Sequence, residues 1–212
     1  MKILVATTNP GKLEELSMLL GDIAGRIEWV SLRDFPGLPE IVEDGATFAD
    51  NARKKALGYA QATGLWTLAD DSGLCIDALH GQPGVLSARF AADECPAADR
   101  KTLDKANYQK VLRLLKDIPD SQRTARFFCH LALVDDKQIL LEATGAVEGV
   151  IINQPRGQNG FGYDPIFYIP SLGKTAAQLD NSSKNQVSHR GHAIRQMKPL
   201  LEQLLAQRQA GR

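Results

Sequence analysis

Hydrophobic positions in the first part of the chain switch between runs typical of strands and spacings typical of helices. Residues 2–7, KILVAT, are almost continuously apolar, as in a strand covered on both faces. After a break at NPGK, leucines recur at helical spacing over residues 13–20. Residues 26–31, RIEWVS, alternate like a second strand, and beyond a Pro-rich loop a helix is expected to begin after Thr47, its predicted N-cap.

The rest of the chain continues this mixture of strands and helices. A third strand is expected at residues 66–69, ending at the aspartates of ADDSGL, and a solvated helix is expected over residues 98–117. Residues 123–134 and 137–152 flank a DD pair and predict a long hairpin. A final helix is expected from about Ser188. This order of elements predicts an α/β fold with a central β-rich layer and helices at both ends.

Composition and charge narrow the class of protein. The length of 212 residues suits one large domain or two small lobes, and 43% hydrophobic residues are enough for a folded core. Lys and Arg together number 25, as do Asp and Glu, so the formal net charge is zero. A protein that grips nucleic acid usually carries a basic excess. Nucleic acid is therefore not expected as a partner.

The cysteines and the N-terminal residues indicate where the protein works. Cys75, Cys95 and Cys129 are widely spaced and form no CxxC pair, which predicts reduced, mostly structural thiols. The start, MKILVATTN, has too few strongly apolar residues for the core of a signal peptide. No run approaches the length of a membrane span. We therefore expect a cytoplasmic protein with no membrane partner.

Two stretches carry lysines that could meet an anion. The loop TTNPGK, residues 7–12, leaves a buried strand and opens a helix, so it offers backbone N–H groups, Thr and Asn side chains and Lys12 to one anionic group. It is neither a Walker A sequence nor GxGxxG. On the residues alone, an ordinary strand-to-helix turn with a surface lysine is equally well supported. For Lys55, within ARKKA, a solvated helix face is the ordinary explanation.

Adjacent aspartates, Asp70 and Asp71, are the next candidates. Neighbouring strand residues face opposite sides, so the two carboxylates are expected to differ in role, one capping the next turn and one projecting past the strand end. The alternative is an ordinary DDSG turn. The preceding loop brings further carboxylates, Glu40, Glu43 and Asp44. This favours a metal site, because Mg²⁺ is held by one or two carboxylates together with substrate phosphates.

Two later stretches could contact a ligand as well. In FGYDP, which follows a Gly-rich approach, Phe161 or Tyr163 could stack on a flat ring; the alternative is a turn whose aromatic residues belong to the core. In KNQVSHRGH, Ser188 as N-cap places His189 and Arg190 in the first turn of the last helix. The helix dipole disfavours cations there, so we expect an anionic group to compensate them.

Four motifs together give the chain a family likeness. With TTNPGK, ADDSGL, FGYDPIF and SHR in this order and spacing, it resembles the inosine triphosphatase family of non-canonical purine nucleoside triphosphate pyrophosphatases, from the N-terminus to the last helix. PGVLSARF and GKTAAQL also match bacterial members. The resemblance implies an α/β fold with a mixed β-sheet core and flanking helices. It further implies a single nucleotide-pyrophosphatase domain over residues 1–212, with two lobes around a central active-site cleft.

The resemblance also implies the reaction and the partners. Members of the family are Mg²⁺-dependent homodimers that hydrolyse ITP, dITP and XTP to the monophosphate and pyrophosphate, and so clear these nucleotides from the pool. By motif, Asp71 would be the proton acceptor for a water that attacks the α-phosphorus, and also a metal ligand. Asp70 would hold the turn or metal-bound waters. The segment of residues 93–110 looks longer than is usual in the family and receives no role.

The resemblance also implies roles for individual residues. Glu43 is expected to be the second metal ligand with Glu40 as its rival, because Val42 fills a place that is often acidic in bacterial members. Residues 7–12 would bind the triphosphate. The turn 161–164, with the SHR motif, would surround the base. The full set expected to contact substrate is Thr7, Thr8, Asn9, Pro10, Gly11, Lys12, Lys55, Ser72, Phe161, Gly162, Tyr163, Asp164, Lys184, His189 and Arg190.

Two other classes of protein stay open from the sequence. A non-catalytic nucleotide-binding regulator would share the phosphate loop but would need no converging carboxylates. A pyrophosphatase for modified pyrimidine triphosphates, as in the Maf family of similar fold, would differ in the base it accepts.

Donors that face a keto group at C6 of the base would favour hypoxanthine and xanthine over adenine, which carries a donor there.

Overall fold

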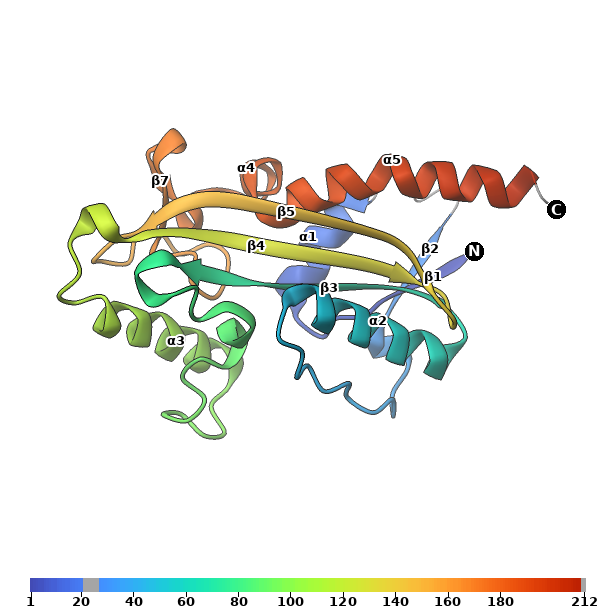
Figure 1. The fold of residues 1–212 in the computed structure, drawn as a ribbon, viewed down its shortest axis with the longest axis horizontal. Helices are drawn as coiled ribbons and strands as arrows, with labels where there is room; N and C mark the ends of the chain where they lie inside the picture. The colour runs from blue at the N-terminus through green and yellow to red at the C-terminus, as the bar shows by residue number, and fades with distance from the viewer. Residues whose placement is uncertain (21–26, 211–212) are drawn as a thin grey trace. The chain divides into compact units, whose positions relative to one another are not determined.

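The computed structural model describes residues 1–20 and 27–210, which form a mixed β-sheet with helices on its faces (Figure 1). Within these residues the sheet has the strand order β2-β1-β3-β4-β5-β6-β7. The strands are β1 (Lys2–Val5), β2 (Glu28–Ser31), β3 (Trp66–Ile76), β4 (Thr124–Val134), β5 (Ile139–Ile151), β6 (Phe167–Ile169) and β7 (Lys174–Thr175). The helices are α1 (Pro10–Leu20), α2 (Phe48–Thr63), α3 (Arg100–Leu114), α4 (Asn181–Val187) and α5 (His189–Ala210).

Strand directions confirm the predicted mixed sheet. β1 runs parallel to both β2 and β3, with Leu4 opposite Val30 on one side and opposite Thr67 on the other. β5 pairs antiparallel with β6, and β6 pairs antiparallel with β7. Parallel neighbours require crossover connections, and α1 and α2 supply them. The predicted α/β class is therefore correct.

The chain divides into two compact units. The first unit comprises Met1–Asp71, Cys129–Gly145 and His189–Arg212, and the second comprises Ser72–Phe128 and Ala146–Ser188. The strands β3, β4 and β5 contribute residues to both units, because three of the divisions fall inside these strands, and the fourth falls between α4 and α5. The description as one domain with two lobes stays a prediction.

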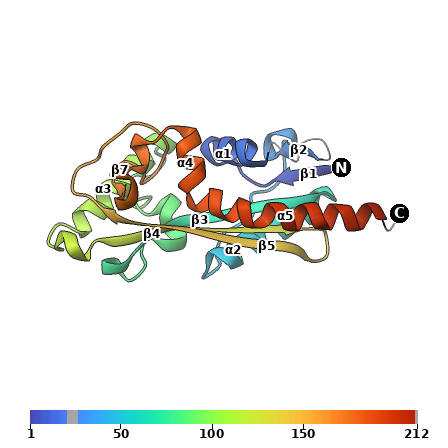
Figure 2. The same ribbon diagram turned by 90° about the horizontal axis from the view of Figure 1, so that it is seen from above.

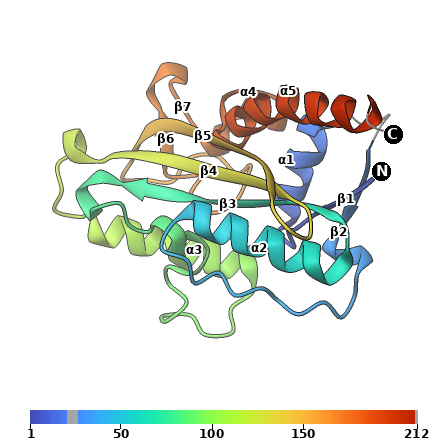
Figure 3. The ribbon, with the colours of Figure 1, turned by 45° about the vertical axis from the view of Figure 1, so that its right-hand side comes forward.

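In the first unit, helices cover both faces of the sheet. Apolar side chains of α1 and α5 pack on one face, and the alanines of α2 pack on the other (Figures 1 and 3). Viewed from above, α5 runs along the strands that it covers (Figure 2). The first face buries Ile3, Val5, Leu16, Leu20, Leu68, Leu131, Leu133, Ile194, Met197 and Leu201. The second buries Leu4, Ala6, Ala52, Ala56, Tyr59, Ala60, Ala69, Ala132 and Val134.

Local signals explain where α2 begins and ends. The hydroxyl of Thr47 accepts a hydrogen bond from the Asp50 N–H at 3.1 Å, so the predicted N-cap is confirmed. Gly64 ends the helix in the left-handed conformation, with φ of +69°, and its N–H donates to the carbonyl of Ala60. These two caps fix the span of the helix that carries Asn51 and Lys55.

The second unit has its own core beneath its part of the sheet. Helix α3 begins after Asp99, whose carboxylate accepts from the Thr102 N–H at 2.8 Å. Its buried residue Val111, and Leu115 directly after its last residue, pack with aromatic and aliphatic side chains from the strands and from the loop after β5. The main members of this core are Leu74, Ile76, Val111, Leu115, Phe127, Ile151, Tyr163, Ile166, Phe167 and Ile169.

Several predicted elements hold, and one boundary is wrong. The hairpin of β4 and β5 is confirmed, with the Asp135 N–H donating to the Gln138 carbonyl in its turn. The second strand is confirmed as Glu28–Ser31, and the predicted start at Arg26 lies outside the described residues. Helix α4 was not predicted.

The third strand does not end at the aspartates, as predicted, but continues to Ile76. The strand continues because alternate side chains, those of Leu74 and Ile76, point into the second unit's core, and because β3 is hydrogen-bonded to β4. DDSG is therefore strand and not turn.

None of the helices in the described part of the chain combines the length and the apolar character that crossing a bilayer requires.

Candidate active site

Residues 7–12 form the connection between β1 and α1. The side-chain oxygen of Asn9 accepts hydrogen bonds from the N–H groups of Gly11 at 3.0 Å and Lys12 at 3.4 Å, and so caps the helix. Pro10 occupies the first helical position, where its missing N–H costs nothing. Thr7 is buried, its hydroxyl accepting from the Asn9 N–H at 3.2 Å, and Thr8 is exposed. The ordinary strand-to-helix turn is thus present, and anion binding there stays a prediction.

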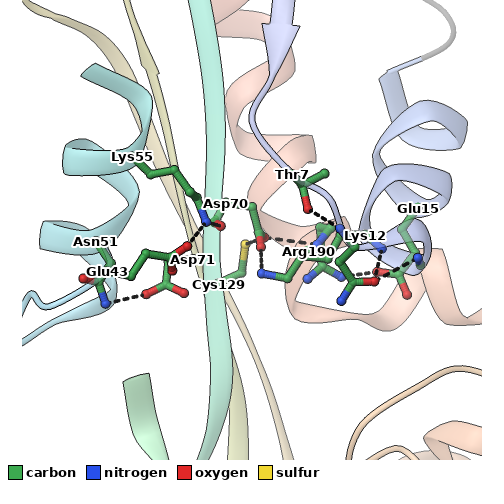
Figure 4. A network of polar contacts seen from close by, with 12 residues as sticks. Thr7, Lys12, Glu15, Glu43, Asn51, Lys55, Asp70, Asp71, Cys129 and Arg190 are labelled. Atoms are coloured by element: carbon green, nitrogen blue, oxygen red, sulfur yellow. Dashed lines mark hydrogen bonds and ion pairs between the residues drawn. The ribbon is translucent and has the colours of Figure 1, made fainter. Parts of the chain in front are cut away.

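Lys12 is not a surface lysine, because its ammonium group pairs with the buried carboxylate of Asp70 (Figure 4). Asp70 also accepts from Arg190 Nε at 3.1 Å and from the thiol of Cys129 at 3.0 Å. The guanidinium of Arg190 pairs in addition with Glu15. Arg190 is only 1% exposed. The first unit therefore contains a buried cluster in which two cations meet two carboxylates.

The charges in this cluster set its protonation states. Burial alone would raise the pKa of Asp70, but Arg190 and then Lys12 hold that pKa well below its usual range. Burial and the neighbouring carboxylate raise the pKa of the Cys129 thiol, so the thiol stays protonated and donates to Asp70. The anionic group expected to compensate Arg190 is thus confirmed. The turn-capping role expected for an aspartate is wrong, because β3 continues past both.

Asp71 faces the opposite side of β3 (Figure 4). Its carboxylate accepts a hydrogen bond from Asn51 Nδ2 at 3.0 Å, and Asn51 is completely buried in the first turn of α2. The other end of the Asn51 amide accepts from the Gly45 N–H at 2.7 Å. Asn51 therefore ties the loop before α2 to the carboxylate of Asp71.

Lys55 lies one turn further along α2 and is buried, which overturns its explanation as part of a solvated helix face. Its ammonium group donates to the backbone carbonyl of Asp70 at 2.8 Å and to Glu43 Oε1 at 3.0 Å. Lys55 thus links β3 to the acidic loop. Its positive charge also acts on Asp71.

The pKa of Asp71 shifts in the direction opposite to that of Asp70. Burial raises it, and the negative charge of Glu43 adds to the rise; Lys12, Lys55 and the bond from Asn51 oppose it. A carboxylate whose pKa is raised is better suited to accept a proton than one locked in ion pairs. Two adjacent aspartates are therefore prepared for different chemistry by what they face.

The carboxylates of Glu43 and Asp71 have the character of a magnesium site. Glu43 is half-buried and its charge acts on Asp71, whereas its rival Glu40 is exposed, as is Val42. Burial and then the charge of Glu43 raise the pKa of Asp71, and a cation would relieve the repulsion between these two carboxylates. Across residues 1–20 and 27–210, no group of three or more His, Cys, Asp or Glu side chains could hold a metal. Two carboxylates fit Mg²⁺, which takes its remaining ligands from phosphates and water.

In the second unit, the turn 161–164 is built around a buried carboxylate. Asp164 Oδ2 accepts from the Phe161 N–H at 2.9 Å and from Lys184 Nζ at 2.7 Å. The same ammonium group lies 4.7 Å from the centre of the Phe161 ring. Gly160 precedes the turn with φ of +75°, and a Cβ there would lie 2.0 Å from Asp164 Oδ2. Only glycine allows this approach.

The remaining predicted residues differ in how they are placed. Tyr163 belongs to the core, and its hydroxyl donates to the Ser87 carbonyl at 2.8 Å, so the alternative of a core aromatic is correct for its ring. Burial raises the pKa of Tyr163. Ser72 follows Asp71 in β3 and is half-buried. His189 lies at the start of α5, as the sequence predicted, and its side chain is buried.

Sequence reasoning missed Asn51 and Glu15. The signal for Asn51 was its place four residues before Lys55 on one face of α2. Glu15 stands three residues after Lys12 on α1, which was a similar signal. Charge and spacing on single helices could therefore have added both to the candidate residues.

Comparisons with known proteins cover nearly the whole chain. Residues 3–200 match the Ham1 family model. A dITP/XTP pyrophosphatase of Desulforamulus reducens is 47% identical over 204 residues, 96% of this chain and 97% of that protein. One of Geobacter sulfurreducens is 45% identical over 197 residues, 93% of this chain and 94% of that protein.

Solved structures agree with these sequence matches. A HAM1 protein of Coxiella burnetii superposes with a TM-score of 0.83 at 44% identity, covering 96% of this chain and 99% of that one. A nucleoside-triphosphatase / dITP/XTP pyrophosphatase of Mycobacterium abscessus gives a TM-score of 0.74 at 45% identity, covering 95% and 100%. The resemblance found in the motifs is thereby confirmed, and this chain belongs to the Ham1 family.

Proposed function

We propose that this protein hydrolyses non-canonical purine nucleoside triphosphates, namely ITP, dITP and XTP, to the monophosphate and pyrophosphate. The observation that carries this proposal is the pair of adjacent aspartates, of which Asp70 is locked in ion pairs while Asp71 has a raised pKa beside Glu43 and Lys55. Names of relatives in the same family point to the same reaction. We further propose that the protein acts in the cytoplasm as a homodimer.

In the proposed reaction, Asp71 is the proton acceptor. It orients a water molecule and takes one of its protons while the water oxygen bonds to the α-phosphorus. The bond from the α-phosphorus to the bridging oxygen breaks, and that oxygen leaves with its electron pair on pyrophosphate. Glu43 and Asp71 would hold Mg²⁺, which when bound offsets phosphate charge and stabilises the leaving group. Asn51 keeps Asp71 in place.

The phosphates are the proposed ligands of the lysines. Lys12 extends from α1 and is fixed by Asp70, and Lys55 is fixed by Glu43, so both ammonium groups are positioned before substrate arrives. Lys184 and Ser72 are two further proposed phosphate contacts. The capped loop 7–12 would contribute the N-terminal end of a helix, where anions are stabilised.

Base choice is proposed to depend on hydrogen-bond donors. The turn 161–164 and the residues His189 and Arg190 are the proposed sources of these donors, which would favour a keto group at C6 of the purine. Adenine carries a donor at that position and would leave these groups unpaired. A site of this kind can discriminate by about 10⁴-fold, far more than a missing methylene allows.

A substrate panel tests the proposal. Purified protein is mixed with ITP, XTP, dITP, ATP, GTP or a methylated UTP, with Mg²⁺ or with EDTA, and monophosphate and pyrophosphate are quantified. We expect ITP, dITP and XTP to be hydrolysed with Mg²⁺ and all activity to be lost with EDTA. Preference for methylated UTP would instead identify a Maf-like pyrophosphatase. Binding of ITP without any pyrophosphate would identify a regulator.

A further inference from the structure

The turn proposed to recognise the base is held from outside by a residue of α3. The backbone N–H of Gly162 donates to Asp104 Oδ2 at 3.1 Å, across 58 positions of sequence within the second unit. Gly162 has φ of +61°, and no atom lies within 4 Å of where its Cβ would be, so glycine is needed there for backbone conformation and not for space. Asp104 therefore holds the N–H side of this peptide, while the Phe161 carbonyl on its other side accepts from the Asp164 N–H at 3.3 Å.

Two carboxylates accept consecutive N–H groups of this turn. Asp164 takes the Phe161 N–H at 2.9 Å, and Asp104 takes the Gly162 N–H at 3.1 Å. Arg100 lies one turn earlier on α3, with Nε 3.0 Å from the other oxygen of Asp104. Burial raises the pKa of Asp104, whereas this ion pair and the bond from Gly162 oppose the rise and favour the charged carboxylate, which is the stronger acceptor. The side chain of Asp104 is only 13% exposed, so water competes little for the bond.

Hydrogen bonds also hold helix α3 in place, so the carboxylate of Asp104 has a fixed position relative to the turn 161–164. One turn after Asp104, the Asn107 amide accepts from the Ala91 N–H at 2.7 Å and donates to the Ser87 carbonyl at 3.3 Å. The hydroxyl of Tyr163 reaches the same carbonyl of Ser87 at 2.8 Å. The turn 161–164 and helix α3 are thus both hydrogen-bonded to the carbonyl of Ser87 in the second unit.

We propose that Asp104 is a positioning residue for base specificity, which sets the orientation of the peptide between Phe161 and Gly162. This rests on the proposed function of the turn in base recognition. A peptide is planar, so holding its N–H fixes the direction of its carbonyl as well. Without Asp104, the peptide keeps the 3.3 Å bond from the Asp164 N–H to the Phe161 carbonyl but loses the acceptor on its N–H side, so its orientation toward the base is less well fixed. The segment of residues 93–110, which received no role from the sequence, thereby gains one.

The hydrogen bond from the Gly162 N–H to Asp104 is tested first, without substrate. Amide hydrogen exchange at Gly162 is measured in the wild type, Asp104→Ala, Asp104→Leu and Asp104→Asn, with Lys105→Ala as a matched control because Lys105 is the exposed neighbour of Asp104 on α3. We expect exchange to be about tenfold faster in the Ala and Leu variants and close to wild type in the Asn and control variants, since Asn keeps an acceptor. Unchanged exchange in both Ala and Leu variants would overturn the proposal.

The specificity role is tested by kinetics on the same variants. We expect loss of the acceptor to raise KM for ITP about tenfold and to lower the ITP-to-ATP ratio of kcat/KM by a similar factor, with kcat and inhibition by pyrophosphate little changed. A parallel loss for ITP and ATP, or no change in their ratio, would refute it. Wild-type protein that fails to hydrolyse ITP contradicts the proposed function instead, and the exchange measurement still decides on Asp104.

Discussion

Asp70 and Asp71 carry the same side chain on adjacent residues, yet the environment separates their chemistry. Asp70 points toward Lys12 and Arg190, which lower its pKa, and Asp71 points toward Asn51 with its pKa raised by burial. The alternation of a β-strand produces this separation without any change in residue type. A pair that looks redundant in sequence thus contains one structural carboxylate and one proposed catalytic carboxylate.

Replacing Asp71 by Asn should reduce activity without reducing stability. We expect kcat for ITP to fall by at least about 10²-fold, because the proton acceptor is lost. The folded-state pKa of Asp71 is raised above its ordinary 3.8, so its contribution to stability is complete below that value and is lost as pH rises through the folded pKa. Asp71→Asn removes this penalty, and its melting temperature at pH 7 should equal or exceed that of the wild type. Thermal unfolding from pH 3 to pH 8 measures the difference.

Asp70→Asn is the matched variant for that comparison. The pKa of Asp70 is depressed, so its contribution to stability is present above 3.8 and is lost as pH falls through the folded pKa. Removing its charge takes one acidic partner from the buried guanidinium of Arg190, which also pairs with Glu15, and we expect a loss of about 3 kcal/mol in the free energy of unfolding at pH 7. Equal stability of the two variants in urea would contradict the assignment.

Part of this site could be predicted from residues alone. Lys12 and Asp71 were found because a loop after a strand and paired carboxylates are chemical signals that lie within short stretches. The partners of Asp70 could not be found in this way, because Arg190 is 120 positions further along the chain. The core position of Tyr163 was likewise undecidable, since an aromatic ring beside glycines suits a turn, a core or a stacking platform.

Helices and strands show the same division between local and distant causes. The N-cap Thr47 of α2 and the β4–β5 hairpin follow from neighbouring residues, and both were predicted; the C-cap Gly64 is equally local but was not predicted. The length of β3 depends on pairing with β4, which starts 48 positions after Ile76, and the strand was therefore wrongly predicted to end at the aspartates. A strand can run through turn-forming residues when distant partners satisfy their polar groups.

The start of α5 rests directly on β5 at a glycine, which gives a test of how tightly these elements pack. A Cβ on Gly145 would lie 2.1 Å from the carbonyl oxygen of His189 and 2.5 Å from the backbone nitrogen of Ala193. These are backbone atoms of a helix, so Gly145→Ala must displace the helix that carries the SHR motif. We expect a loss of about 2 kcal/mol in unfolding free energy, together with reduced ITP hydrolysis.

Gly58→Ala is the control for this prediction. The atoms nearest to its added Cβ belong to the side chain of Ile41, with Cδ1 at 2.7 Å, and not to backbone, and alanine favours the helix α2 in which Gly58 lies. Urea unfolding should show this variant to be close to the wild type. A Gly145→Ala protein as stable as the Gly58→Ala protein would mean that α5 does not sit against β5 as described.

Taken as a whole, the molecule is electrically neutral, and its site cations are already paired. Lys12 pairs with Asp70, Lys55 with Glu43, and Lys184 with Asp164. A triphosphate therefore meets lysines whose charge is largely balanced by carboxylates. This balance is the physical reason to expect that hydrolysis depends on Mg²⁺, and that chelation abolishes it even though every lysine remains in place.

Hydrolysis of ITP in H₂¹⁸O tests most directly whether the protein delivers water to the α-phosphorus. Attack there places the heavy oxygen in inosine monophosphate and leaves pyrophosphate unlabelled, and the two products form in equal amounts. The Asp71→Asn protein should form neither at an appreciable rate. Label in pyrophosphate, or release of orthophosphate in its place, would contradict attack at the α-phosphorus.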